Sequence, residues 1–128
     1  AASKIATNKK IRDFINNQQK IIVKNQLKFR GCIIDGRDIG SVVFKKASIK
    51  IYVVVDEIIR AKRRHKQLID IGEKSIYAKI LKEIKLRDKK DKLRKNSPLV
   101  KPRGAFILNN SNSFSDTIKQ INKIMESK

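Results

Sequence analysis

The sequence has few residues of several types, and each scarcity narrows the class of protein. Cys32 is the one cysteine, so the chain cannot form an internal disulfide, which predicts a reducing cytosol. Because Cys32 lies within an apolar run, we expect a buried structural thiol rather than a nucleophile. No apolar run approaches the ~18 residues of a membrane span, and the N-terminus lacks the apolar core of a signal peptide. Together these features predict a cytoplasmic protein with no membrane partner.

Acidic side chains are also few, which leaves a large positive charge. The 128 residues include 32 Lys and Arg but only 12 Asp and Glu, a formal net charge of +20 at pH 7. This charge favours partners that carry phosphate or are polyanionic. A lysine-rich composition throughout the organism would produce the same charge without any binding role, so both interpretations remain open. Aromatic residues make up only 5% of the chain and Trp is absent, which leaves little surface on which nucleobases could stack.

Hydrophobic periodicity divides the chain into alternating helices and strands within one domain. Apolar residues recur with a helical period in the first segment, while short β-branched runs bounded by polar residues predict strands covered on both faces. The predicted helices are Lys9–Gln26, Asp56–Gly72, Ser75–Arg94 and Asn112–Met125, and the predicted strands are Cys32–Asp35, Ser48–Val55 and Gly104–Leu108. Strands separated by helices indicate an α/β fold with a mostly parallel sheet.

Local signals set the expected ends of these helices. Acid in the first turn, at Asp56 and Glu57, favours a helix start, and Ser75 is expected to cap the next helix. Pro98 prevents that helix from continuing. His65 falls on the apolar side of its helix, so we expect it to pack rather than to act as a base.

The stretch GCIIDGRDIGS, residues 31–41, has a glycine spacing close to that of a phosphate-binding loop. Its two central isoleucines occupy the place of the loop, however, and Arg-Asp replaces the final Lys-Ser/Thr, so we interpret the spacing as a coincidence. A strand that delivers Asp35 to its carboxyl end is the better interpretation, because open α/β sheets bind ligands there. Asp35 could then hold Mg²⁺, and Arg37 offers a bidentate fork for phosphate.

The helix that follows Ser75 has a core-facing stripe that becomes charged toward its C-terminal end. With ~100° per residue, Ile80 and Ile84 share this stripe with Arg87, Asp91 and Arg94. One interpretation is an exposed Arg87–Asp91 pair on a helix that extends beyond the core, worth about 0.3–0.5 kcal/mol. The other is a set of charges that converges with Arg37 on one anionic ligand.

Three segments, in this order and at these separations, carry a resemblance to a known family: IIDGRDIGSVVF, RAKRRHKQL and EIKLRDKKDKLRKNSPL. The chain resembles bacterial cytidylate kinase, a nucleoside monophosphate kinase of the P-loop class. The opening ASKIATNKKIR also fits, so the resemblance covers essentially all 128 residues. It implies part of a P-loop kinase fold, a parallel sheet flanked by helices with a helical lid. Residues 1–28 would form a helical CMP-binding region, and residues 60–95 the lid and the phosphate-facing helices.

The resemblance also implies roles for individual residues in binding CMP. Cytosine would be recognised by an acid that accepts from its exocyclic amine and by donors to its ring acceptors, a pattern that disfavours uracil. The residues that match contacts to the base are Ser3, Arg12 and Asp38. The residues that match contacts to the sugar and phosphates are Arg37, Arg87, Asp91 and Arg94, of which the three arginines would neutralise charge during transfer.

For the phosphoryl donor, the resemblance implies ATP together with Mg²⁺. Asp35 matches an acid near the magnesium ion, and Arg63 matches a lid arginine that closes over ATP, with Arg60 and Arg64 in support. The complete protein would be a monomer that phosphorylates CMP or dCMP to CDP or dCDP.

The sequence departs from the family in one respect. None of its five glycines belongs to a G-x-x-x-x-G-K-[ST] motif, so the chain resembles the C-terminal part of a cytidylate kinase without the phosphate-binding loop. We therefore expect the isolated chain to be inactive as a kinase. Two alternatives remain: a related kinase for another nucleoside monophosphate, and a small basic nucleic-acid-binding protein. The second is not favoured, because the basic residues form no recognisable recognition module.

Overall fold

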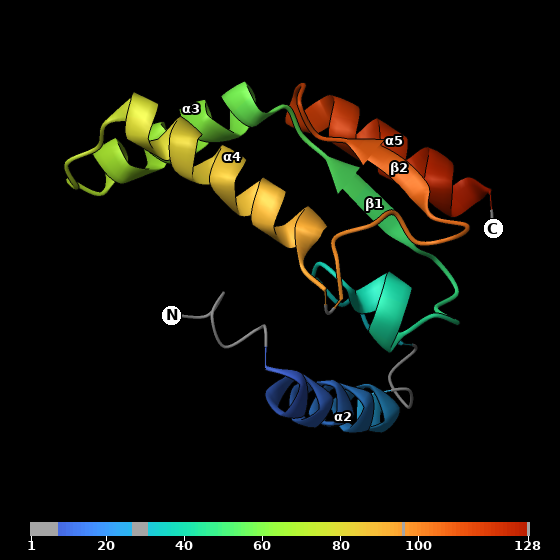
Figure 1. Ribbon diagram of the computed structural model, residues 1–128. Coiled ribbons are helices and arrows are strands. Elements are labelled where there is room, and N and C mark those ends of the chain that lie inside the picture. Colours follow the sequence, from blue (N-terminus) through green and yellow to red (C-terminus); the bar gives the residue numbers. More distant parts are fainter. Residues whose placement is uncertain (1–7, 27–30, 96, 128) are drawn as a thin grey trace.

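The computed structural model describes residues 8–26, 31–95 and 97–127 (Figure 1). Two parallel strands lie at the centre, with one helix packed against the sheet and a pair of helices extending from the strand ends. A further helix, α2, lies along another side of the molecule. The predicted order of helices and strands is confirmed from residue 51 onward, and so is the parallel pairing.

The sheet consists of β1 (Ile51–Val54) and β2 (Phe106–Asn109), paired in parallel with Ile51 opposite Phe106. Both strands are shorter than predicted. The pairing extends slightly beyond the strands, since the Phe106 amide donates to the Lys50 carbonyl at 2.9 Å. A β-branched run correctly predicted β1 and a short apolar run correctly predicted β2, while the ladder of hydrogen bonds set the length of each.

The predicted strand Cys32–Asp35 is wrong. Residues 31–36 are irregular, and no described strand pairs with them. Ile33 is fully exposed, and Cys32 is exposed as well, so the expectation of a buried thiol is also wrong. An apolar run becomes a strand only where a neighbour completes its backbone hydrogen bonds, and that neighbour lies outside what local sequence can specify.

One face of the sheet is covered by α5 (Phe114–Glu126), which Figure 1 shows lying alongside β2. Ser113 caps this helix by accepting a hydrogen bond from the Asp116 amide at 3.1 Å. Leu108 of β2 and Ile124 of α5 are both buried. The Gln120 side chain binds both backbone groups of Asn109 at 2.9 Å, and so completes the hydrogen bonding at the end of β2.

The helices α3 (Glu57–Asp70) and α4 (Tyr77–Leu93) lie side by side. Asp56 caps α3 by accepting from the amides of Ile58 and Ile59, which confirms the predicted start. The Glu73 amide reaches back to the Leu68 carbonyl and Gly72 takes a φ of +77°, a conformation that ends a helix. Ala61 is completely buried, and such a small side chain lets the two helices approach closely.

The prediction that Ser75 caps α4 is wrong. Ile76 occupies the capping position without a side-chain hydrogen bond. The Ser75 hydroxyl instead lies 2.8 Å from His65 Nδ1, and the His65 ring makes an edge contact with Tyr77. His65 therefore packs between the helices, as its place on the apolar face predicted.

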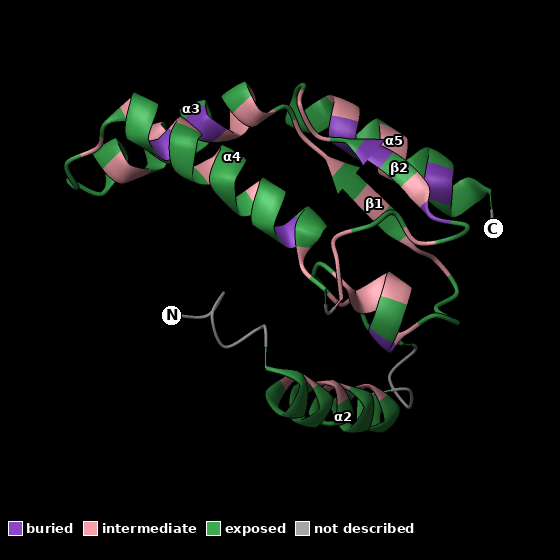
Figure 2. Cartoon of the chain, viewed as in Figure 1, coloured by how far each residue is buried: buried purple, intermediate pink, exposed green. Residues whose placement is uncertain are grey.

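The helix α2 (Lys9–Gln26) has the predicted bounds but contains no buried residue (Figure 2). Its apolar stripe faces solvent, and Phe14 is 64% exposed. The residues of α2 that are half-buried lie on a different side of the helix: Arg12, Asn16, Gln19 and Val23. The buried hydrophobic residues of the described chain are correspondingly few. None of the described helices is long and apolar enough to span a membrane.

Candidate functional site

An ion pair joins α2 to the Asp-Gly-Arg-Asp turn. The Arg12 guanidinium contacts the Asp38 carboxylate, and both side chains are largely buried, at 13% and 14% exposed. Asp38 is held from its backbone side too, because its carbonyl accepts from the Val42 amide at 2.8 Å at the start of η2 (Ile39–Val43), a single π-helical turn. The turn thus fixes an acid and an arginine from distant segments next to each other.

Asp91 joins the same turn to the end of α4. Its carboxylate pairs with Arg37 through one oxygen and with Arg94 Nη1 through the other, at 3.6 Å. Asp91 is buried, although it lies on a helix rich in exposed lysines. Beyond the helix, the Leu99 amide donates to the Asp91 carbonyl at 2.8 Å, and Arg94 donates to the Ser97 carbonyl.

These contacts test one of the two interpretations of the charged stripe. Asp91 pairs with Arg37 and Arg94, and Arg87 is exposed without an ion pair to any described residue. The expectation of an exposed Arg87–Asp91 pair is therefore wrong. Arg37 does lie beside Asp91, while convergence of these charges on an anionic ligand stays a prediction.

The resulting cluster carries three guanidinium groups and two carboxylates, and so retains one net positive charge. We call these five residues the arginine cluster: Arg12, Arg37, Asp38, Asp91 and Arg94. Arg37 is the most open of them, with its side chain 40% exposed. It contacts Asp91 through Nε, and its guanidinium group is a planar fork of N–H donors. Such a fork matches the oxygens of a phosphate group.

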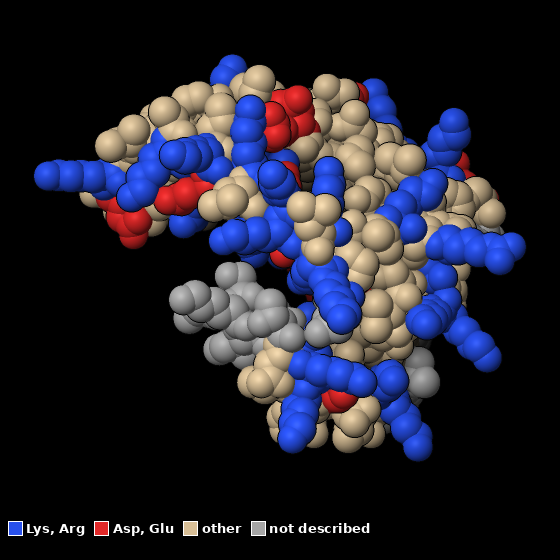
Figure 3. Space-filling view, viewed as in Figure 1, with Lys and Arg blue, Asp and Glu red and all other residues tan. Residues whose placement is uncertain are grey.

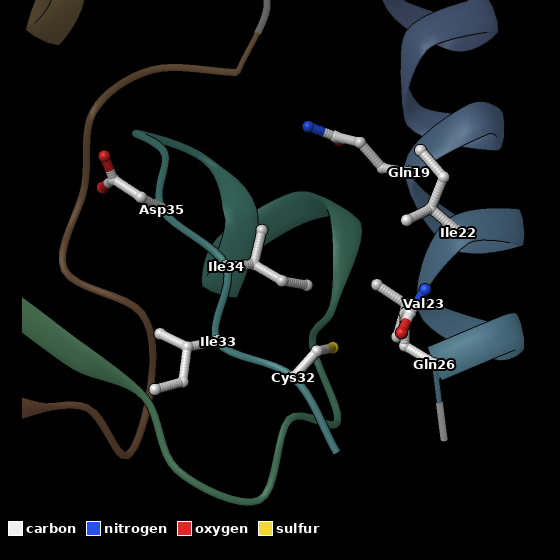
Figure 4. Close-up of a pocket in the computed structure, with 8 residues that line it drawn as sticks. All are labelled: Gln19, Ile22, Val23, Gln26, Cys32, Ile33, Ile34 and Asp35. Carbon is white, nitrogen blue, oxygen red and sulfur yellow. The ribbon is translucent and has the colours of Figure 1, made fainter. Parts of the chain in front are cut away.

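Asp35 lies outside the arginine cluster, beside an open pocket of about 280 Å³ between α2 and the segment before the turn. In Figure 4 the Asp35 carboxylate points away from α2, whereas the Cys32 sulfur points toward it. The pocket is lined by Gln19, Ile22, Val23, Gln26, Cys32, Ile33, Ile34 and Asp35. Within the described ranges no three acidic, His or Cys side chains are grouped to hold a metal ion. Asp35 could thus contribute one carboxylate to a magnesium site but not a complete set of ligands.

The three arginines expected at the lid do not converge in this structure. Arg60 forms a two-point contact with Asp88 of α4, at 3.0 and 2.5 Å. Arg63 donates to the Asn112 carbonyl at 3.1 Å, and Arg64 to the Gln67 side chain on its own helix at 2.8 Å. Ser3 lies outside the described residues.

Sequence reasoning missed Asp88. Its side chain and that of Arg60 are 26% and 35% exposed, and together they tie α4 to the first turns of α3. The hydrogen bond from Arg60 holds the pKa of Asp88 below its ordinary value of 3.8, and the Arg60 charge adds to this effect while burial opposes it. No spacing rule links two residues on different helices, so the sequence carried no signal for this pair.

The Arg60–Asp88 pair should make the free energy of unfolding depend on pH. Because the pKa of Asp88 is lower in the folded chain than in the unfolded chain, its contribution is present above about pH 4 and is lost as the pH falls through the folded pKa. A double-mutant cycle with R60A and D88N should give a coupling free energy of about 1 kcal/mol near neutral pH. The coupling free energy should vanish in acid, where Asp88 is protonated. Urea unfolding of the four proteins of the cycle, near neutral pH and in acid, measures it.

The Glu57–Lys85 pair serves as the matched control, because it joins the same two helices at 3.0 Å but is more exposed. The corresponding cycle with E57Q and K85M should give a coupling below about 0.5 kcal/mol. Equal coupling in the two cycles would show that partial burial of the Arg60–Asp88 pair has no energetic consequence.

The parallel strands and the arginine cluster define an α/β protein with a site suited to a phosphate-bearing ligand. A sequence model of the cytidylate kinase family matches residues 1–127, and the chain belongs to this family. The predicted resemblance is confirmed.

Individual relatives agree with the family assignment. The chain is 38% identical to the cytidylate kinase of Thermosipho melanesiensis over 128 residues, which are 99% of this chain and 57% of that protein. It is 40% identical to the cytidylate kinase of Thermosipho africanus over 125 residues, 98% of this chain and 54% of that protein. A third relative is the cytidylate kinase of Rickettsia akari, 38% identical over 128 residues, 99% of this chain and 57% of that protein. The chain thus spans little more than half the length of these relatives.

Proposed function

We propose that this chain provides the CMP-binding part of a cytidylate kinase, which transfers the γ-phosphoryl group of ATP to CMP or dCMP. The arginine cluster is the observation that carries the proposal, because it gathers five polar residues from three segments of a chain that belongs to the cytidylate kinase family. Residues 1–28 would belong to the CMP-binding region, and residues 60–95 to the lid and the phosphate-facing helices.

The Arg12–Asp38 pair supports a role in base recognition. It sets a donor and an acceptor side by side, which is the pattern that cytosine requires along its O2, N3 and amino edge. Uracil reverses the pattern at two of these atoms and would leave polar groups unpaired. In this proposal Ser3 adds a further donor to the base.

The phosphate of CMP would bind at the other end of the cluster. Arg37 and Arg94 are both held by Asp91, which orients their guanidinium groups and limits their mutual repulsion. Arg87, which is exposed one turn before Asp91, would join them when ligand is present. Phosphoryl transfer needs positioning and charge neutralisation more than a side-chain base, and these three arginines supply that charge.

The donor side of the reaction would use Mg²⁺ and ATP. Bound Mg²⁺ would neutralise phosphate charge, with Asp35 as one carboxylate near it. Arg63 would have to exchange its hydrogen bond with the Asn112 carbonyl for ATP phosphates, with Arg60 and Arg64 beside it on α3. The sequence contains no G-x-x-x-x-G-K-[ST] motif, so turnover would need a phosphate-binding loop from elsewhere.

Titration calorimetry of the chain with mononucleotides tests this proposal. We expect CMP to bind more tightly than UMP by about tenfold or more, because each mismatched polar contact costs about 1–3 kcal/mol. D38N should abolish most of this preference. D70N is the matched control, since Asp70 is exposed at the end of α3 and should leave the preference unchanged.

Two results would contradict the proposal. Equal affinity for CMP, UMP and AMP would exclude base recognition by Arg12 and Asp38. Turnover of CMP by the chain alone, measured by coupled release of ADP, would show that no additional phosphate-binding loop is needed.

A further inference from the structure

Two tight turns at the amino ends of β1 and β2 present basic side chains. In the first, the Ala47 amide donates to the Phe44 carbonyl at 3.1 Å, which places Lys45 and Lys46 at the tip of the turn. In the second, the Ala105 amide donates to the Pro102 carbonyl at 3.1 Å, with Arg103 at the tip. We call the basic residues of these two loops the turn patch: Lys45, Lys46, Lys50, Lys101 and Arg103.

The second turn has a backbone conformation that restricts its shape. Gly104 takes a φ of +73°, which a glycine adopts at the third position of such a turn without steric cost. Pro102 precedes it with a fixed φ. Arg103 thus lies between a proline and a glycine with positive φ, which restricts the backbone of the turn.

Two hydrogen bonds join Lys50 of the first loop to the second loop. Lys50 Nζ donates to the Arg103 carbonyl at 3.3 Å, and the Phe106 amide donates to the Lys50 carbonyl at 2.9 Å. The amino ends of two parallel strands lie at the same edge of a sheet, so residues more than fifty positions apart become neighbours here. The patch is therefore a property of the fold rather than of one basic run.

The two loops contain no acidic residue of their own. Residues 39–55 and 92–115 contain no Asp or Glu, although the whole chain has 12 of them. The residues of the patch other than Lys50 are exposed, and none of the five forms an ion pair with an acid in the described part of the chain. In Figure 3, Lys and Arg side chains project from the right-hand edge of the molecule, where Figure 1 shows these loops.

We propose that the turn patch binds the phosphate backbone of a nucleic-acid duplex without sequence preference, a partner class that the sequence alone did not favour because its basic residues match no recognition module. The ligand must be polyanionic, because the patch offers several cations on two tight turns and no acid. It presents no exposed aromatic ring on which unpaired bases could stack, so a duplex backbone fits its chemistry better than a single strand. No patch residue has a role in the proposed kinase reaction, and this inference is independent of it.

Fluorescence anisotropy with a short labelled DNA duplex tests the proposal on the chain as it is. Four contacts to phosphates predict a slope of about −4 when log K is plotted against log salt concentration. The variant K45Q/K46Q/K101Q/R103Q removes four cations, so it should weaken binding by about tenfold or more and make the slope shallower by about 4. The charge-retaining variant K45R/K46R/K101R should bind like the unmodified chain.

The matched control removes the same charge elsewhere. K20Q/K66Q/K74Q/K79Q changes four exposed lysines on α2, α3, α4 and the turn between α3 and α4, and should alter the affinity by less than about twofold. Circular dichroism verifies that each variant is folded. If the quadruple variant does not fold, the double variants K45Q/K46Q and K101Q/R103Q test the two loops separately.

Several outcomes would overturn the proposal. An equal loss in the patch and control variants would mean that only net charge matters. Displacement of the duplex by CMP would show that the duplex binds at the mononucleotide site and not at the turn patch. Binding that does not weaken as the salt concentration rises would exclude phosphate contacts.

Discussion

Replacing Asp91 by asparagine is expected to lower the free energy of unfolding by about 2–3 kcal/mol. Asp91 is buried and its carboxylate separates Arg37 from Arg94. The amide keeps the shape but removes the charge, so two guanidinium groups are left near one another without a counter-ion. Because Arg37 is 40% exposed and partly solvated, the loss should fall below the cost of breaking a fully buried ion pair.

Urea unfolding measures this effect. D70N removes an exposed acid from the end of α3 and should change the unfolding free energy by no more than about 0.5 kcal/mol. R94K retains one positive charge beside Asp91 and should be less harmful than D91N. If D91N matched D70N, the burial of Asp91 would contribute nothing to stability.

The second large effect concerns ligand binding. Arg37→Ala is expected to weaken CMP binding by about 10- to 100-fold, because a charge-assisted hydrogen bond to phosphate contributes about 1.5–3 kcal/mol. Arg37 is the arginine chosen for this test because its Nε contacts Asp91 while its side chain is partly open to solvent. Calorimetric titration of the unmodified chain and of R37A measures the affinity of each protein for CMP.

Cytidine provides an internal control because it carries the same base and sugar but no phosphate. R37A should bind cytidine as the unmodified chain does, within about twofold, if Arg37 contacts only phosphate. R103A removes an exposed arginine from the turn patch and should affect neither ligand. An equal loss of CMP and cytidine binding in R37A would mean that Arg37 acts through the fold of the site and not through the phosphate.

Local patterns predicted the elements whose signals are complete within the element. The periodicity of α2 gave its bounds, and the acid at Asp56 marked the start of α3 because its carboxylate bonds to amides two and three residues on. Capping and periodicity involve only neighbours in sequence, so they can be read without knowledge of the fold.

Predictions failed where a partner from elsewhere decided the outcome. Cys32–Asp35 has the composition of a strand but no described strand beside it. Ser75 is a good cap by residue type, yet its hydroxyl meets His65 of the preceding helix instead. Asp88 gave no signal at all, because its partner Arg60 is 28 positions away on another helix.

The sequence by itself determined the family, the charge of the chain and the residues available for a phosphate-binding site. Only the tertiary structure decided which of these residues meet. Asp91 could have paired with Arg87 on its own helix, and instead it pairs with Arg37 and Arg94. The turn after α2 and the chain beyond α4 bring these groups together, and electrostatic attraction acts through space rather than along the sequence.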